Sequence, residues 1–174
     1  MEMIQAPDQI QRDRLARMVQ QYEKDLLRIC YTYLHDRTAA EDTVQETFLK
    51  AFRHLDSFRG ESSEKTWLIR IAINCCRDYR RSAWFRYVDP RIDIDQLPVL
   101  ASAPPSDDHI ALTAAIMRLK PRYMEVVLLY FYEGYSVREI ADMLCLSEST
   151  VSGRIHRARQ KLKNELEGGE DHVG

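Results

Sequence analysis

The sequence predicts an all-α protein with two small helical domains, an N-terminal helical bundle and a C-terminal helix-turn-helix, joined by a proline-rich acidic linker. Three observations predict this fold. Glycine and proline number only six each among 174 residues, so residues that form turns are scarce. Apolar residues recur over long segments at the spacing of an amphipathic helix. Four of the six prolines fall within residues 87–112, where no helical spacing is sustained.

The composition excludes several classes of protein. The formal net charge of −2 rules out a uniformly basic coat, and no apolar run approaches the roughly 20 residues of a membrane helix. The first 11 residues lack the basic and apolar regions of a secretory signal, so we expect a cytoplasmic protein. None of the four cysteines has C-x-x-C spacing, so we expect small buried hydrophobes and no metal site or disulfide framework.

Two helices are predicted before residue 56. The first runs from about Asp8 to Leu34. Its apolar side holds Leu15, Val19, Tyr22, Leu26, Ile29 and Tyr33. The second begins at Thr38, with Glu41 three residues later as a capping box. It is expected to bury Val44, Phe48, Ala51, Phe52 and Leu55.

The opposite face of the second helix is mostly polar. It presents Asp42, Gln45, Glu46, Leu49 and Arg53. A single leucine among carboxylates and an amide suggests a surface for a protein partner. An ordinary solvated helix face is the alternative.

A third helix is predicted from about Glu64 to Arg81. Its buried stripe is Leu68, Ile71, Ala72, Cys75 and Tyr79. Another face carries Trp67, Arg70, Asn74, Arg77, Asp78 and Arg81. Arginines can hold phosphate, and an aromatic or amide side chain can contact an exposed base. We therefore predict a nucleic-acid surface, with Trp67 as a core anchor the alternative. The polar loop before this helix, residues 57–63, could form a pocket for an extruded base.

Charge is distributed unevenly along the chain. Residues 59–86 hold seven basic and three acidic side chains, whereas residues 87–112 hold one basic and five acidic. Residues 151–164 hold five basic side chains and no acidic one. Two candidate polyanion surfaces therefore flank an acidic tether, although each could be a solvated face. The predicted parts are a domain over 1–86, a linker over 87–112, a domain over 113–168 and a disordered tail over 169–174.

The second domain has the pattern of a helix-turn-helix. Pro121 suits the first turn of one helix, which ends at Gly134. Ser136 and Glu139 form a capping box that begins a short helix. A turn at Cys145, where a glycine is common, leads to Ser147 as the N-cap of a helix over about 148–166. The small core is Ile140, Leu144, Leu146, Val151 and Ile155.

The last helix has the features of a recognition helix. Its buried stripe is Val151, Ile155, Ala158, Leu162 and Leu166. The opposite face carries Ser149, Gly153, His156, Arg157 and Gln160, with Thr150, Ser152 and Arg154 on the flanks. Small polar residues come first and cations later, so the helix can reach base edges in the major groove while its cations hold phosphate. A three-helix protein-interaction module with a solvated basic face is the alternative.

Two long segments resemble one known family. Residues 39–81, AAEDTVQETFLKAFRHLDSFRGESSEKTWLIRIAINCCRDYRR, resemble the second region of extracytoplasmic-function (ECF) sigma factors. Residues 119–166, from LKPRYMEVV to KLKNEL, resemble their fourth region. The resemblance implies an alternative bacterial sigma factor that binds RNA polymerase core and directs promoter melting and transcription initiation. It implies no catalytic residue, no cofactor and no small-molecule substrate.

The resemblance also assigns roles to individual residues. Asp42, Gln45 and Glu46, beside Leu49, match the contact with the clamp helices of the largest polymerase subunit. The −10 element would be bound by Phe58, Arg59, Gly60, Glu61, Ser62, Trp67, Arg70, Asn74, Arg77, Arg80 and Arg81, with the loop and Asn74 capturing a flipped base. The −35 element would be bound by Ser149, Thr150, Ser152, Gly153, Arg154, His156, Arg157 and Arg159. The fourth region would also pack on the polymerase flap, and an anti-sigma protein, often anchored at the membrane, would hold the factor inactive.

One departure from the family pattern concerns the recognition helix. The family usually has Lys or Arg and then Ser after the central valine, but here Ser152 and Gly153 follow Val151. A cation expected in the groove is therefore missing, which predicts a non-standard promoter or a weaker −35 contact.

Other functions stay open on the sequence alone. A two-domain helix-turn-helix regulator would bind duplex DNA without polymerase. An enzyme is disfavoured because the chain has no glycine-rich phosphate loop and no H-E-x-x-H motif, and its five histidines show no pairing with a nucleophile.

Overall fold

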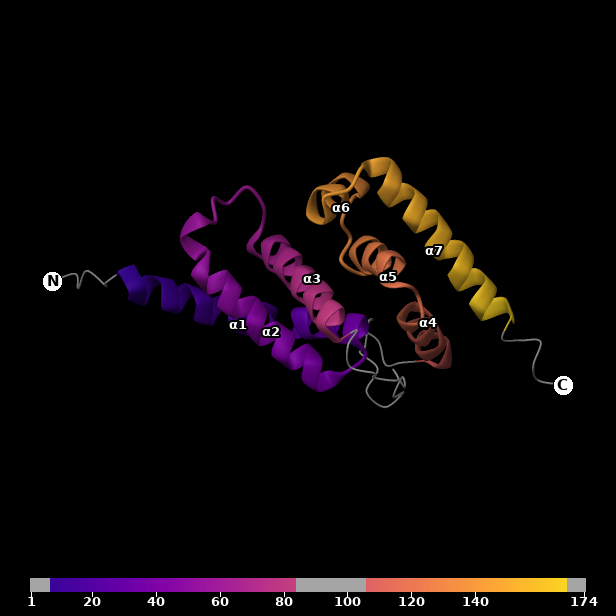
Figure 1. Cartoon of the computed structure of the whole chain (residues 1–174), viewed down its shortest axis with the longest axis horizontal. Helices are drawn as coiled ribbons and strands as arrows, with labels where there is room; N and C mark the ends of the chain where they lie inside the picture. The colour runs from indigo at the N-terminus through magenta and orange to yellow at the C-terminus, as the bar shows by residue number, and fades with distance from the viewer. Residues whose placement is uncertain (1–6, 84–105, 169–174) are drawn as a thin grey trace. The chain divides into compact units, whose positions relative to one another are not determined.

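The computed structural model describes residues 7–83 and 106–168 (Figure 1). Within these ranges the chain forms α-helices, one 3₁₀ turn and one π-helical turn, and no strand, as the sequence predicts. They fall into two compact units: the first contains most of α1 with α2 and α3, and the second contains α4 to α7. Most of the predicted linker, residues 87–105, and the predicted tail, residues 169–174, lie outside the described residues.

The first unit is built from three helices, α1 (Pro7–Leu34), α2 (Arg37–Arg53) and α3 (Glu64–Ala83). α2 and α3 lie side by side (Figure 1). Apolar side chains recur along each helix at a spacing of three to four residues, so each helix buries one stripe of apolar side chains. The largest buried side chains here include Met18, Leu26, Val44, Phe48, Leu68 and Ile69. The 3₁₀ turn Leu55–Ser57 follows α2 and leads into the loop before α3.

The predicted start of α2 was wrong by one residue, and its cap is different. Asp36, rather than Thr38, is the N-cap, and its carboxylate accepts a hydrogen bond from the Ala39 amide at 2.8 Å. Asp is among the best N-caps, and the earlier start also lets Arg37 bind Glu41 one turn later, with Nε 2.9 Å from Oε1. Glu41 therefore serves an ion pair and not a capping box.

Several apolar positions differ from their predicted burial. Half-buried rather than buried are Tyr22, Phe52, Ile71, Leu146 and Leu162, and Leu166 is 40% exposed. Tyr79, assigned to the core stripe of α3, is 41% exposed because it lies near the end of that helix. Leu15 and Val19 of α1 are only half-buried, since they line a surface groove, whereas Met18 is fully buried. The predicted stripe of α1 is confirmed in the second half of the helix, where Leu26, Ile29 and Tyr33 are buried.

The second unit begins with a helix that the sequence analysis placed in the linker. α4 (Asp107–Met117) starts at Ser106, whose side chain accepts a hydrogen bond from the His109 amide. Asp107 and Asp108 lie in its first turn, where carboxylates favour the positive end of the helix dipole. The acidic residues taken as a sign of linker thus begin a helix. The linker prediction is wrong from residue 107 onwards.

α5 (Pro121–Val127) continues into a π-helical turn over Leu128–Tyr132. Pro121 occupies the first turn, and the chain leaves at Gly134, whose φ of +76° favours glycine, as predicted. The capping box at Ser136 is also confirmed. The Ser136 amide donates to Glu139 Oε2 at 2.8 Å and the Glu139 amide donates to Ser136 Oγ at 3.3 Å. The hydrogen bond that the Ser136 hydroxyl donates to Glu139 Oε2 at 2.7 Å, together with the bond from the Ser136 amide, lowers the pKa of Glu139 from its ordinary value.

α6 (Val137–Leu144) and α7 (Glu148–Gly168) form the helix-turn-helix (Figure 1). Cys145 at the turn has a φ of +55°, in the left-handed region where glycine is common. It is exposed, so the prediction of four buried cysteines fails at this position, while the other three are buried. Ser147 caps α7, as predicted, by accepting a hydrogen bond from the Thr150 amide at 3.2 Å. α7 packs on α4, α5 and α6.

Candidate functional site

The loop before α3 forms a pocket in the first unit. The cavity measures about 350 Å³, and six of the predicted −10 residues line it. Its lining is Ser57, Phe58, Arg59, Glu61, Ser62, Trp67 and Arg70. Gly60 turns the loop with a φ of +72°, a conformation that favours glycine. The size and the mixture of aromatic, cationic and hydroxyl groups suit a planar base with an attached phosphate.

Two aromatic rings form one wall of this pocket. Phe58 and Trp67 lie with their ring centroids 4.8 Å apart, tilted by 35°. Trp67 is half-buried, so its ring is neither fully exposed for a base to stack on nor fully buried in the core. On Phe58 the guanidinium of Arg14, from α1, lies 5.3 Å from the ring centroid. Arg14 comes from a helix far from this loop in the sequence, and no sequence pattern links it to the pocket.

The start of α3 is fixed by an ion-pair cluster. Arg14 donates from Nε and Nη2 to Glu64 Oε1 at 3.0 and 2.9 Å, and Arg17 Nη2 binds both oxygens of the same carboxylate. Desolvation raises the pKa of Glu64, but the hydrogen bonds from Arg17 and Arg14 outweigh it and hold the pKa below its ordinary value. Ser63 caps α3 by accepting from the Thr66 amide at 3.0 Å.

The other predicted −10 residues lie further along α3. Asn74, Arg80 and Arg81 are exposed and Arg77 is half-buried, and the pocket lining ends before them at Arg70. Asp78 lies among these cations, with Arg81 Nη2 3.5 Å from its carboxylate and Lys50 Nζ of α2 3.8 Å away. The structure thus separates a pocket at the start of α3 from a basic face along its second half.

The predicted partner surface on α2 borders an apolar groove. Asp42, Gln45 and Leu49 are exposed and Glu46 is half-buried, and Leu49 is 52% exposed. The groove measures about 500 Å³ and lies between α1 and α2. Its lining is Leu15, Val19, Glu23, Leu27, Glu41, Val44, Gln45, Phe48 and Leu49. Gln45 and Leu49 therefore belong to the groove, whereas Asp42 and Glu46 do not line it. An apolar floor with glutamates at its border suits a partner helix with basic flanks.

A third cavity, of about 360 Å³, lies beside the recognition helix α7. Five predicted residues line it together with two from α5 that the sequence analysis missed. The lining is Arg122, Tyr123, Ser149, Thr150, Gly153, Arg154 and Arg157. Gly153 leaves open space above its backbone, since a Cβ there would meet no atom within 4 Å. Three guanidiniums around a small polar cavity can hold phosphate.

Tyr123 connects the two helices of this cavity. Its side chain is buried, and the guanidinium of Arg122 lies 4.8 Å and Lys161 Nζ 5.8 Å from its ring centroid. Desolvation raises the pKa of Tyr123, but the charges and hydrogen bonds of Arg122 and Arg157 outweigh it and lower the pKa below its usual range. Pro121 predicts that Arg122 lies in the first turn of a helix, but no feature of the sequence predicts that the Arg122 side chain lies beside α7.

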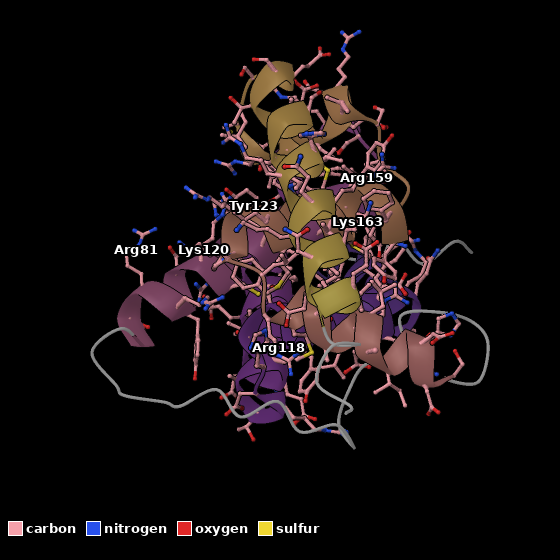
Figure 2. All side chains as sticks on the ribbon, turned by 90° about the vertical axis from the view of Figure 1, so that its right-hand side faces the viewer. Arg81, Arg118, Lys120, Tyr123, Arg159 and Lys163 are labelled. Atoms are coloured by element: carbon pink, nitrogen blue, oxygen red, sulfur yellow. The ribbon has the colours of Figure 1, made fainter. Side chains whose placement is uncertain are left out.

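Three predicted −35 residues lie outside this cavity. Ser152 and His156 are exposed on α7 without lining it. Arg159 lies on the other side of α7 from Tyr123, with its guanidinium 5.0 Å from the ring centroid of Phe131 (Figure 2). Phe131 and Tyr130 are exposed and pack edge to face at 5.0 Å. A DNA contact by Arg159 therefore stays a prediction.

Comparison with known proteins agrees with this organisation. Residues 18–86 match the family model for Sigma-70 region 2 and residues 109–162 match that for Sigma-70 region 4. The chain is 31% identical over 163 residues to the RNA polymerase sigma factor YlaC of Bacillus subtilis, covering 89% of this chain and 93% of YlaC. It is 30% identical to the ECF RNA polymerase sigma factor SigW of the same organism, covering 88% and 89%.

Solved structures show the same fold. CnrH, solved in complex with the cytosolic domain of CnrY, is 28% identical with a TM-score of 0.68, and the match covers 90% of each chain. The sigma factor RpoE of Bartonella quintana, at 24% identity, matches with a TM-score of 0.67 over 87% of this chain and 96% of RpoE. The latter likeness concerns the fold alone.

A helical unit that matches Sigma-70 region 2, followed by a helix-turn-helix unit that matches region 4, defines a bacterial sigma factor. The chain belongs to the ECF family of RNA polymerase sigma factors. It is an alternative sigma factor that directs promoter recognition and transcription initiation, and members of this family are initiation factors rather than catalytic enzymes. Among the described residues, no helix has the length and apolar character to cross a membrane.

Proposed function

We propose that the three cavities divide the work of a sigma factor among polymerase, the −10 element and the −35 element. The observation that carries this proposal is the loop pocket at the start of α3, where two aromatic rings in contact and two arginines line a cavity of about 350 Å³. Bases have an aromatic face and an adjacent phosphate, so stacking and cations together can hold one extruded base.

Promoter melting would begin at this pocket. Phe58 and Trp67 form its aromatic wall, and Arg59 and Arg70 supply charge for the neighbouring phosphates. Asn74 lies one turn beyond Arg70 and would contact the next exposed base. Arg77, Arg80 and Arg81 would then hold the promoter backbone along α3. Backbone contacts fix register, while the pocket supplies sequence preference.

The −35 element would be read by α7. Ser149, Thr150 and Gly153 lie in its first turns, where a recognition helix contacts base edges. Arg154 and Arg157 would hold phosphate together with Arg122 of α5, which lines the same cavity. Ser152 occupies the place of the missing cation and leaves this interface one charge short of the usual family pattern.

Polymerase core would bind the α1–α2 groove and its border. We assign the clamp helices of the largest polymerase subunit to Asp42, Gln45, Glu46 and Leu49, because an exposed leucine and an apolar groove lie beside carboxylates. The flap of polymerase would contact the second unit. The division into functional domains follows the helices: α1 to α3 for polymerase and the −10 element, α4 to α7 for the −35 element.

We also propose an anti-sigma partner and a cytoplasmic location. Family membership implies a protein that holds the factor inactive, in some cases anchored at the membrane. CnrH, a structural relative, was solved in complex with the cytosolic domain of CnrY. Affinity purification of the tagged chain from unstressed cells should recover such a partner in place of polymerase, and recovery of polymerase alone would contradict this part of the proposal.

The test of the division of labour is transcription by reconstituted polymerase on duplex and premelted promoter templates. Variants of the loop pocket should impair transcription from duplex templates more than from premelted ones. Variants of α7 should impair binding to closed duplex promoter. Equal effects of both groups on both templates would contradict the assignment.

A further inference from the structure

One face of α1 holds the pocket-forming loop in place. Gln11 Nε2 hydrogen-bonds to the carboxylate of Asp56 in the 3₁₀ turn before the loop. One turn along α1, Arg14 binds Glu64 at the other end of the loop and covers the ring of Phe58 in between. Contacts from a single helix thus reach the beginning, the middle and the end of the segment 56–64.

We propose that Arg14 is a positioning residue for the promoter-base pocket. The inference rests on the proposed function of that pocket as the site of base capture. Arg14 itself lies outside the cavity lining, so, anchored by Glu64, it would act through the ring of Phe58 and not by touching the base. The family-model match to region 2 begins at residue 18, so this role does not come from the matched segment.

Geometry distinguishes Arg14 from its neighbours on α1. Its guanidinium is shared between a carboxylate 2.9 Å away and an aromatic ring 5.3 Å away, which fixes the plane of the ring relative to the start of α3. Arg17 binds the same carboxylate, but it is 54% exposed. Arg12 is exposed on the same helix. The three arginines therefore differ in their contacts with the loop and the start of α3. Arg14 contacts Glu64 and Phe58, Arg17 contacts Glu64, and Arg12 serves as the control.

The ring of Phe58 transmits this constraint to the pocket. Phe58 packs on Trp67, which is part of the cavity wall. Loss of the Arg14 guanidinium allows the ring of Phe58 to rotate. The orientation of Phe58 relative to Trp67 then varies, and a base meets several arrangements of the two rings rather than one. A pre-arranged pair binds with a smaller loss of conformational entropy, so affinity for the preferred base should fall more than affinity for the others.

The experiment compares variants in two measurements, the exposure of Trp67 and the affinity for single-stranded DNA. Trp84→Phe leaves Trp67 as the single tryptophan, and acrylamide quenching of its emission reports its exposure in the free protein. The full chain with polymerase core is then titrated with labelled 15-nucleotide oligothymidylates that carry A, C, G or T at the central position. Arg14→Ala, Arg14→Lys, Arg17→Ala and Arg12→Ala are compared with the parent, and circular dichroism checks that each is folded.

Arg14→Ala should increase quenching of Trp67 and lower affinity for the preferred oligonucleotide by about fivefold, the scale of one cation–π contact, with smaller losses for the other three. Arg14→Lys should recover part of the preference, and Arg12→Ala should match the parent. Phe58→Leu with Arg14→Ala should be no worse than Phe58→Leu alone, because Arg14 acts through that ring.

Three different results would overturn the proposal. If Arg14→Ala behaves like Arg12→Ala while the parent prefers one base, the positioning role fails and the proposed pocket stands. If the parent binds all four oligonucleotides equally, the base pocket fails and the positioning role fails with it. If Arg14→Ala lowers affinity for all four oligonucleotides by one factor, Arg14 contributes only general charge and the proposal is wrong.

Discussion

The ring of Phe58 lies against that of Trp67, with centroids 4.8 Å apart, at the junction of the loop and α3. This pair brings an aromatic wall to a cavity that also contains Arg59 and Arg70. Stacking of a base on an aromatic side chain is worth about 1–3 kcal/mol. The pair therefore has the energy to favour one extruded base, but not to open a promoter without polymerase.

The first prediction concerns this pair. Phe58→Leu keeps an apolar side chain and removes the aromatic face, so promoter opening should fall by about tenfold, in line with the lower part of that stacking range. Closed-complex formation should be unchanged. Permanganate footprinting reports opening and filter binding reports the closed complex. Tyr79→Leu, an exposed aromatic on α3, is the control, and equal losses from both variants would contradict a special role for Phe58.

The second prediction concerns polymerase binding. Asp42→Arg with Glu46→Arg should abolish binding to polymerase core and leave helicity intact, because both side chains lie outside the buried core of α2 and follow the groove residues Glu41 and Gln45 in the sequence. Leu49→Asp should have a similar effect through the groove itself. Asp13→Arg with Glu167→Arg makes the same change in net charge at exposed sites elsewhere. Wild-type affinity for core in the Asp42 and Glu46 double variant would refute the assignment.

The third prediction assigns different roles to the arginines of α3 and to the Asn74 side chain. Arg77→Ala or Arg81→Ala should weaken binding to all promoters and reduce the salt dependence by about one phosphate contact each. Asn74→Ala should spare the closed complex and impair strand opening, and its base preference on a premelted template should be less stringent. If Asn74→Ala opens promoters normally while Arg77→Ala changes base preference, the roles are reversed.

The fourth prediction concerns the interface of α5 with α7. Arg122→Ala should weaken binding to a duplex −35 fragment and reduce the salt dependence of that affinity by about one phosphate contact. Arg157→Ala should have the same effect. Ser152→Lys should raise duplex affinity by supplying the missing cation. Lys163→Ala, further along α7, is the matched control. A salt slope unaffected by Arg122→Ala would remove α5 from the DNA interface.

The fifth prediction uses the low pKa of Glu64. Because the folded-state pKa lies below the ordinary value of 4.5, the ionised carboxylate stabilises the fold above that pH, and this stabilisation disappears as pH falls through the folded pKa. The difference in melting temperature between the wild type and Glu64→Gln should therefore be constant near neutral pH and shrink below about pH 4.5. Glu167→Gln is the exposed control. A difference that persists unchanged under acid would show that the Arg14 and Arg17 pairs contribute no net stability.

Sequence patterns predicted the helices well where a local rule sets the boundary. Ser136 with Glu139, Pro121 and Gly134 each determine a helix end within a few residues of themselves, and all three are confirmed. α4 was missed because its acidic first turn resembles a linker in composition. The N-cap of α2 was misplaced because two good caps, Asp36 and Thr38, compete within three residues.

The site residues that were missed come from distant segments. Arg14 reaches Glu64 across 50 positions, and Arg122 joins a cavity whose other cations lie on α7. No spacing rule links such positions, since only the packing of helices brings them together. Arg159 and Arg157 look alike in the sequence, but two residues on a helix differ by about 200° in direction, so one faces Phe131 and the other faces Tyr123.

If this chain directs polymerase to promoters through the loop pocket and α7, it should create new transcription start sites. Transcription of genomic DNA by purified polymerase core with and without the chain, followed by sequencing of the 5′ ends of the transcripts, measures this. We expect new start sites that appear only with the chain and share one −10 and one −35 sequence, and that are lost with Phe58→Leu. Start sites identical to those of core alone would show that the chain does not select promoters.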